Sequence, residues 1–411
     1  MALLVSAKGS DVLAWRAAGD FAVTYRQMVL DRMEFCRADE AAAMLADVSR
    51  ALEELTAAND RFCSGCDSLI AEVAACSEPS RLRELTTAFF TGLYDHIGSH
   101  HAVPAFYQFS ILFLQALAGS IGRYACAMLG PPPVRMPELA IIALGPAGRQ
   151  EFSPFCPLQF LLVHGHAGDA QELLVHRFAV LLHEGFEACG LQVDGEVTPR
   201  NSQWRGSLPE WGQRLGKALE RGRSADVIEL LCLTDQTLLD GTPDLGSGFR
   251  QLSLSALGAS PLAVNNLVSR AVSLSNGIGM MGGLRFERSG AYRGRFDLLD
   301  NALKPLSASV AALGLLKHLD GAATPRRIRE LLWRRDLNVD MAERLLQAWH
   351  TIHELRLTRE REVLPDWSDS SPLHLEVEQM DVPEQEALRE SLEAVGTIQR
   401  HVGLNFSGAG E

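Results

Sequence analysis

The spacing of apolar residues changes twice along the chain and divides it into three parts. From about residue 10 to 130, apolar residues recur every three or four positions, as in "DEAAAMLADVSRALEELTAANDRF" and "SRLRELTTAFFTGLYDHI", which predicts amphipathic helices. Residues 139–163 instead contain two short apolar runs, "LAIIALG" and "LQFLLV", bounded by Gly or Pro and typical of strands. From about residue 260 the helical spacing returns.

The middle part alternates between strand-like and helix-like segments. A helix is predicted over "AQELLVHRFAVLLHEGFEACG", ending at Gly190, and a second one over "LPEWGQRLGKALERG". Between them "LQVDGEVTPRN" is hairpin-like, and "VIELLCLTDQTLLDG" follows as a strand-like run. This alternation predicts a small domain in which helices pack on a sheet.

The predicted fold class is therefore α+β, with three domains. We expect a helical N-terminal bundle over residues 1–130, a central α/β domain with a small mixed sheet over 131–258, and a C-terminal helical bundle over 259–411. The segment "GPPPVRMPE" separates the first two domains as a rigid connector, because successive prolines favour an extended path and cannot continue a helix.

Composition and charge exclude several classes of protein. The 411 residues are 47% hydrophobic, which is ample for buried cores, and the formal net charge of −13 argues against binding nucleic acid through its phosphates. The most apolar segment is interrupted by Gln108, Gln115 and Arg123, so no membrane span is predicted. We expect a cytoplasmic protein that binds neither nucleic acid nor membrane.

Cysteine and histidine spacing gives weak signals for metal binding. Cys63 and Cys66 have the spacing of a metal or redox pair, but no second such pair or matching histidine pair completes a zinc site. The three histidines of "YDHIGSHHAVP" are predicted to lie in a solvated loop, because a glycine and a proline interrupt the segment. Trp204 and Trp211 are predicted to be core aromatics rather than base-stacking groups.

The stretch "ALGPAGRQEFSPFCPLQFLLVHG" has the outline of a nucleoside triphosphate site: a strand, a glycine turn, a short polar segment and a second strand. In such a site the turn presents backbone N–H groups to phosphate, and two acidic residues two positions apart on the next strand hold divalent cations. Here those two positions are Pro157 and Gln159, and neither offers a charged oxygen to a hard cation.

This stretch resembles the bacterial nucleotidyltransferase-like proteins related to the protein-PII uridylyltransferase. Their pattern is Gly-Pro-Pro, a strand, Gly-Ser-Glu-Gly-Arg-x-Glu, and then Asp-x-Asp before an apolar strand. The resemblance continues through "ACGLQVDGEVTPRNSQWRGSLPEWGQRL", "LTDQTLLDG" and "RFDLLDNALKPLSASVAAL", and covers roughly residues 80–406. It implies a nucleotidyltransferase-like central domain followed by a helical output domain.

The resemblance assigns Gly145, Gly148, Arg149 and Glu151 to the remnant of a nucleotide site, and Asp235 to the remnant of a metal site. Each residue also has a structural interpretation. The glycines suit a turn that needs positive φ or close backbone approach. Arg149 and Glu151 suit an ion pair, and Asp235 suits a hydrogen bond to its own strand.

The departures from the family pattern are at its functional positions. Pro146 replaces the Ser of the glycine turn and removes both a hydroxyl and a backbone donor. Pro157 and Gln159 replace the Asp pair, and Thr237 replaces the Arg that follows the third acidic residue. One carboxylate is a poor Mg²⁺ site, so we expect metal-dependent catalysis to be lost.

Three hypotheses follow. The first is a regulatory or protein-binding module without catalytic residues or cofactor; on this hypothesis Asp235→Ala should fold normally and lose no interaction. The second is an active nucleotidyltransferase that uses Mg²⁺ and an NTP with replacement ligands. The third is a nucleotide sensor that binds without metal through Arg149 and the turn amides. A protein partner or a homodimer is expected, and "ADEAAAMLADVSRALEEL" offers a surface for it, although its apolar stripe is equally suited to burial within its own bundle.

Overall fold

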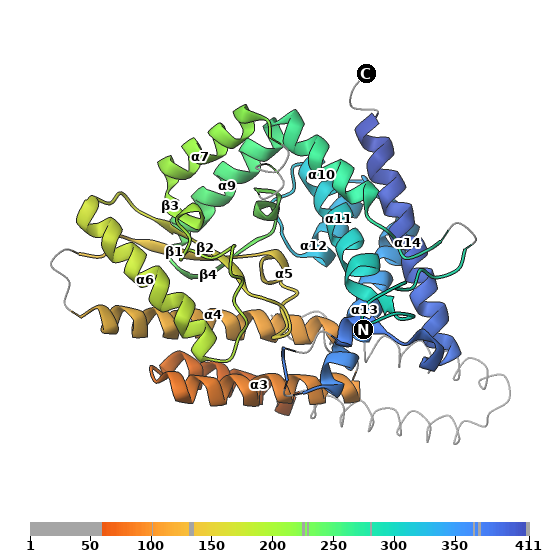
Figure 1. Ribbon diagram of the computed structural model, residues 1–411, viewed down its shortest axis with the longest axis horizontal. Helices are drawn as coiled ribbons and strands as arrows, with labels where there is room; N and C mark the ends of the chain where they lie inside the picture. The colour runs from red at the N-terminus through yellow and green to blue at the C-terminus, as the bar shows by residue number, and fades with distance from the viewer. Residues whose placement is uncertain are drawn as a thin grey trace, which may run out of the picture.

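The computed structural model describes residues 60–407, apart from residues 101, 131–134, 224–226, 228–229, 280–281, 365 and 369–370. The predicted partner surface in "ADEAAAMLADVSRALEEL" therefore lies outside the described residues. Within them the chain combines many helices with a small mixed sheet, which confirms the predicted α+β class (Figure 1).

The described N-terminal part is helical, as predicted. A helix over residues 60–75 is followed by α3 (Pro79–His100) and α4 (Val103–Leu129). The prediction of a loop was wrong at His96 and His100, because α3 continues through Gly98 to His100, while the third histidine, His101, lies outside the described residues. Burial of Leu93, Tyr94 and Ile97 on this helix outweighs the cost of about 1 kcal/mol that a helical glycine carries.

Helix α4 is the apolar centre of this half of the molecule. Among the described helices it alone is long and apolar enough to cross a membrane, but half of its most apolar window is buried within the protein. It packs against α3, against strand β4 and against α6 (Asp169–Ala188). The polar interruption at Gln115 is used in this packing, since its amide donates to the carbonyl of Leu238 at 2.9 Å. These contacts are those of a core helix.

The central sheet has four strands in the order β3-β2-β1-β4: β1 (Leu139–Leu144), β2 (Gln159–His164), β3 (Arg205–Ser207) and β4 (Gln236–Gly241). Strand β1 pairs antiparallel with β2 and β4, and β2 pairs parallel with β3. Leu144 pairs with both Gln159 and Gln236, so the end of β1 lies beside the beginnings of β2 and β4. This register brings distant segments of the sequence to one edge of the sheet.

Helices cover both faces of the sheet. In Figure 1, α6 and α4 lie on one side, and α7 (Leu208–Arg221) and α9 (Pro243–Ala259) lie on the other. Helix α7 begins at a capping box in which Glu210 accepts from the backbone N–H of Ser207 at 2.6 Å. The helices predicted for this region are therefore confirmed.

Two predicted elements of the central part were wrong. Residues 191–201 form turns with one parallel bridge between Val193 and Leu158 rather than a hairpin, because the carboxylate of Asp194 accepts two successive backbone N–H groups and closes a turn. The first half of "VIELLCLTDQTLLDG" ends in the 3₁₀ helix η3 (Leu231–Thr234), and only its second half is strand β4. Short apolar runs do not distinguish a strand from a buried helical turn.

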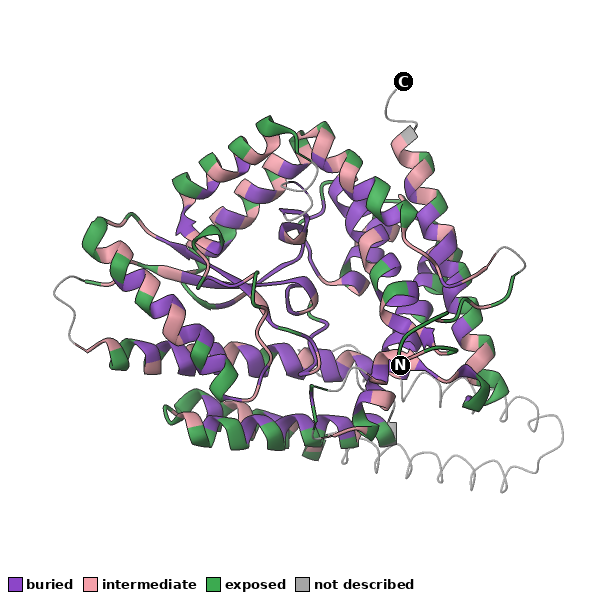
Figure 2. Cartoon of the chain, in the orientation of Figure 1, coloured by how far each residue is buried: buried purple, intermediate pink, exposed green. Residues whose placement is uncertain are grey.

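The C-terminal part is helical, as predicted. Its principal helices surround a common core with the small ribbon β5 (Phe296–Asp297) and β6 (His374–Leu375), and the π-helical turn η4 (Leu299–Leu303) leads into α11. Figure 2 shows that burial continues from the sheet into these helices. The helices are α10 (Pro261–Ser273), α11 (Lys304–Leu316), α12 (Thr324–Trp333), α13 (Val339–Glu362) and α14 (Val382–Ser407).

Candidate functional site

The candidate site lies where β1 enters a single helical turn, α5 (Gly145–Gly148). Gly145 adopts a φ of 56°, in the left-handed region that favours glycine, and Gln150 leaves the turn with a φ of 61°. The carbonyl of Gly145 accepts from the N–H of Arg149 at 2.9 Å, and the carbonyl of Pro146 accepts from that of Glu151 at 2.7 Å. The predicted glycine turn is therefore present.

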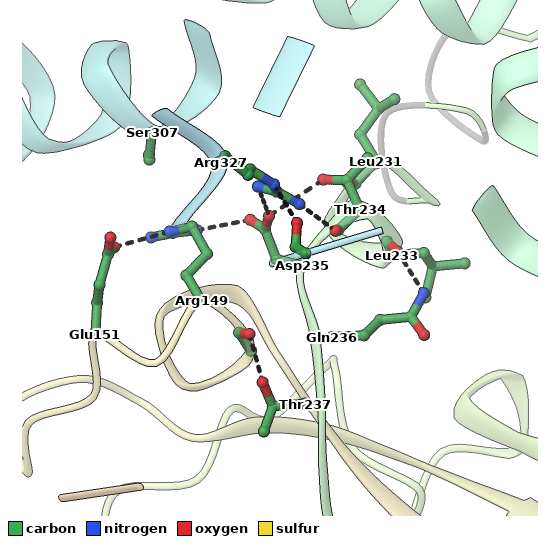
Figure 3. Close-up of polar contacts among 12 residues, drawn as sticks. Arg149, Glu151, Leu231, Leu233, Thr234, Asp235, Gln236, Thr237, Ser307 and Arg327 are labelled. Carbon is green, nitrogen blue, oxygen red and sulfur yellow. Dashed lines mark hydrogen bonds and ion pairs between the residues drawn. The ribbon is translucent and has the colours of Figure 1, made fainter. Parts of the chain in front are cut away.

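The turn is packed against other parts of the protein. A Cβ atom on Gly145 would lie 2.5 Å from the side-chain oxygen of Gln159, and one on Gly148 would overlap the backbone carbonyl of Asp235. The hydroxyl of Thr237, which replaces the family's Arg, donates to the carbonyl of Gly148 at 2.8 Å (Figure 3). Gly145 is thus required by its positive φ and Gly148 by the close approach of the Asp235 backbone, as their structural interpretation predicted.

The carboxylate of Asp235 is shared by two guanidinium groups (Figure 3). Its Oδ2 accepts from Arg149 at 2.8 Å, and its Oδ1 accepts from Arg327 at 2.7 Å. Arg327 lies on α12 in the C-terminal part, is 3% exposed, and also donates to the carbonyls of Thr234 at 2.6 Å and Gly321 at 2.7 Å. Each carboxylate oxygen of Asp235 therefore already has a cationic partner.

Arg149 continues this chain of charges to Glu151. Its Nε donates to Glu151 Oε2 at 2.9 Å while its Nη1 donates to Asp235. Burial lowers the pKa of Arg149, but the charges of Glu151 and Asp235 outweigh it and hold the pKa above its ordinary value. The predicted ion pair between Arg149 and Glu151 is confirmed. The negative charges of Glu151 and Asp235 are thus balanced by the positive charges of Arg149 and Arg327.

Glu151 also connects the site to α13. Its Oε1 accepts from the indole N–H of Trp349 at 2.9 Å and lies 3.9 Å from His353 Nε2. Burial opposes ionisation of Glu151, but the charge of Arg149 prevails and lowers its pKa to about 2. Burial lowers the pKa of His353 to about 3, so this imidazole is neutral, and its Nδ1 lies 2.7 Å from the hydroxyl of Tyr107.

Pro157 and Gln159, which stand at the two positions of the family's Asp pair, have different surroundings. Pro157 is exposed and precedes β2, whereas Gln159 begins the strand beside the glycine turn. The amide of Gln159 donates to Asp194 Oδ2 at 2.8 Å. Asp194 thus lies next to Gln159, at the second position of the family's Asp pair, although its Oδ1 already accepts from the N–H groups of Glu196 and Val197.

The structure brings most of the predicted residues together and adds others. Gly145, Gly148, Arg149, Asp235 and Gln159 form one cluster. Sequence reasoning missed the residues that reach it from other elements, since nothing local in "TPRRIREL" or "LLQAWHTIHEL" separates a buried side chain from an ordinary helix residue. They are Arg327, Trp349 and His353. Asp194, a carboxylate outside the family pattern, also reaches the cluster through Gln159.

The other candidates from the sequence lie away from this cluster. Trp204 and Trp211 are buried, and Trp211 packs edge-on against Phe249, which confirms their prediction as core aromatics. Cys63 and Cys66 are free thiols on the helix over residues 60–75, and burial raises the pKa of Cys66 to about 12. A thiol with so high a pKa is a poor nucleophile and a poor metal ligand at neutral pH.

Comparison with known families identifies two domains in the chain. The family model described as "Putative nucleotidyltransferase DUF294" matches residues 93–225, and the model described as "Putative nucleotidyltransferase substrate binding domain" matches residues 261–406. The matches together span more than half of the chain. No curated protein matches the chain.

The structure leaves the interactions of Asp235→Ala with other molecules untested, but it shows that this change would remove the shared partner of two arginines within the protein. We expect Asp235→Asn, which keeps the side-chain shape, to lower the free energy of unfolding by up to about 3–5 kcal/mol, since it leaves buried guanidinium groups uncompensated. Urea denaturation followed by circular dichroism measures this. Asp240→Asn, at an exposed position of β4, the strand that follows Asp235, is the control and should change it by less than about 0.5 kcal/mol. Equal stability of the two variants would contradict the shared ion pair.

The lowered pKa values of Glu151 and His353 predict that the folded protein loses stability in acid. Both have a folded-state pKa below the ordinary value, so the unfolded chain binds more protons as the pH falls. Stability is complete above about pH 6.5 and declines first through His353 and then, below about pH 4.5, through Glu151, by at most about 1.4 kcal/mol per pH unit for each group. Urea midpoints measured from pH 7.5 to 4.5 should fall less steeply in His353→Gln, while His166→Gln, at an exposed position, keeps the wild-type slope. Parallel curves for all three proteins would rule out this role of His353.

Proposed function

This chain belongs to the nucleotidyltransferase-like DUF294 family, and we propose that it is a member that has lost metal-dependent catalysis and works as a regulatory, protein-binding module. The proposal rests on the state of Asp235, the acidic residue retained from the motif. Both of its oxygens accept hydrogen bonds from guanidinium groups at 2.7 and 2.8 Å. A magnesium ion bound to Asp235 would lie directly beside two guanidinium groups of its own sign.

Charge balance supports the loss of metal binding. Nucleotidyl transfer with divalent cations depends on a local excess of carboxylates, which offsets the charge of the ions. Here Asp235 and Glu151 are matched by Arg149 and Arg327, and the two positions of the Asp pair, Pro157 and Gln159, carry no charge. Asp194 is the nearest replacement, but its carboxylate already holds a turn and the amide of Gln159. A divalent cation at this position would be left without compensating charge.

The C-terminal domain supports the same conclusion. Arg327 comes from the region that matches a model described as substrate binding. In this chain that region contributes a side chain to the position of the metal, and α13 adds Trp349 to the same cluster. The two matched regions therefore contact one another directly through Glu151 and Trp349, and Asp235 links them through Arg149 and Arg327. A direct contact of this kind between the two regions suits a structural or regulatory role better than catalytic turnover.

The arrangement also counts against a metal-independent nucleotide sensor. Such a sensor would use the Arg149 guanidinium and the amides of the glycine turn to hold phosphates. Arg149 already bridges two carboxylates, and Gln159 and Asp235 lie against the turn. Phosphate would have to compete with charges of its own sign for the same guanidinium.

A protein partner is the remaining part of the proposal. Trp333, at the end of α12, is 79% exposed, and exposed tryptophans are frequent anchors of protein interfaces. The opposite end of the same helix carries Arg327 into the cluster. A partner that binds at Trp333 would therefore contact α12, the helix whose Arg327 donates to Asp235. A second copy of the chain is an alternative partner.

Isothermal calorimetry with ATP, UTP, CTP and GTP tests the proposal. We expect no saturable binding of any nucleotide, either with Mg²⁺ or with EDTA, because no carboxylate of the motif is free and the turn is packed. Binding that requires Mg²⁺ would support an active transferase with recruited ligands. Binding in EDTA would support the sensor. Arg327→Met, which frees one oxygen of Asp235, separates the causes: a gain of Mg²⁺-dependent binding in this variant would identify Arg327 as the group that excludes the ion.

A further inference from the structure

A second cluster of potential ligands lies at the opposite end of β2 from Gln159. His164 ends the strand, and its side chain is fully buried. Its Nδ1 lies 2.7 Å from the carbonyl oxygen of Gly165. A carbonyl can only accept, so Nδ1 carries a proton, and Nε2 is the ring nitrogen that could bind a metal ion. That Nε2 is buried and has no hydrogen-bond partner, which is unusual for a buried polar atom.

Two carboxylates face this nitrogen from different helices. Glu172, in the first turn of α6, places Oε1 at 3.4 Å from Nε2, and Glu210, in the first turn of α7, places Oε2 at 3.9 Å. One ligand atom from each of the three residues lies within 4.8 Å of the others. A tetrahedral zinc ion with bonds of about 2.0–2.2 Å holds its ligands about 3.4 Å apart. The His164–Glu172 separation has this value. Glu210 lies 3.9 Å from Nε2 and within 4.8 Å of the Glu172 ligand atom, so its side chain would have to move closer to complete the site.

We propose that His164, Glu172 and Glu210 form a binding site for Zn²⁺. The combination of one imidazole nitrogen and two carboxylates suits zinc, whereas Mg²⁺ and Ca²⁺ prefer sites made of oxygen alone. A zinc ion would supply the missing partner of His164 Nε2. It would also neutralise Glu172 and Glu210, which approach one another as like charges.

The groups around the three ligands hold them in place. The carbonyl of Gly165 fixes the ring of His164, as the outer hydrogen bond of a metal-bound histidine does. Ser207 holds Glu210 Oε2 through its N–H at 2.6 Å and its hydroxyl at 2.7 Å. Burial opposes ionisation of Glu210, but these two hydrogen bonds prevail and lower its pKa, so the carboxylate is charged at neutral pH.

The ligands differ in their access to solvent. Glu172 and Glu210 line an open cleft together with Ser202, Arg205 and Arg214, while His164 forms the buried side of the cluster. The remaining coordination positions of a zinc ion would face this cleft. Arg205 and Arg214 add positive charge there, so an anion suits the fourth position. Bound zinc would join β2, α6 and α7, and the site is separate from Asp235 and its arginines.

Metal titration of the EDTA-treated full-length protein tests the site. With Zn²⁺ in competition with a chromophoric chelator, we expect one equivalent to bind to this site. Glu172→Gln, a change at a partly exposed position, should weaken this affinity about tenfold or more, and Ser207→Ala should weaken it through Glu210 by about 10–100-fold. Glu220→Gln removes an equal charge from an exposed position of α7 and should leave the affinity unchanged.

Co²⁺ used as a spectroscopic substitute identifies the ligands. We expect visible absorption of a four-coordinate ion with nitrogen and oxygen ligands, which is lost in His164→Gln. Because His164 is buried, circular dichroism must show that this variant is folded, and Glu172→Gln provides the test at a position that tolerates change. Absence of a stoichiometric zinc site overturns the proposal. A thiolate-to-cobalt band that persists in both variants does so as well, because it would assign the metal to cysteines.

Discussion

The structure depends on a buried carboxylate placed between two guanidinium groups. Asp235 lies between η3 and β4, Arg149 follows the glycine turn, and Arg327 belongs to α12, so a single side chain joins three segments that are far apart in the sequence. Burying these charges costs free energy that only close pairing recovers. Removing any one of them leaves another uncompensated. The relative positions of the sheet and the C-terminal helices are therefore coupled to this ion pair.

A second group of buried polar residues extends the same coupling. Glu151 is held by Arg149 and Trp349, and a few residues further along the chain Ser153 donates to Glu360 at 3.1 Å. Glu360 is completely buried and also accepts from Tyr94 of α3 at 2.6 Å. The segment that follows the glycine turn is thus fixed by helices from both ends of the chain. Opening the site would require several of these bonds to break together.

The local pattern predicted most helices and strands β1 and β2, because burial on one face leaves a period in the sequence. It also predicted the glycine turn and the pair formed by Arg149 and Glu151, which are close in sequence. It could not predict that Arg327 or Trp349 reaches the same cluster, since the packing of α12 and α13 against the sheet decides this. It failed at Gly98 and at residues 191–201 for a related reason. Tertiary burial extended α3 through Gly98, and the side chain of Asp194 closed a turn within residues 191–201.

The missing Asp pair and the bound Arg327 are two aspects of one electrostatic change. A nucleotidyltransferase site is negative when empty, and the metal ions restore its balance. With Pro157 and Gln159 on the chain, Asp235 would be buried beside Arg149 and Glu151 with an excess of negative charge and no ion to offset it. Arg327 supplies the single positive charge that this arrangement lacks. Restoring two aspartates alone would therefore leave an arginine in the place of the metal, and recovery of metal binding requires Arg327 to leave as well.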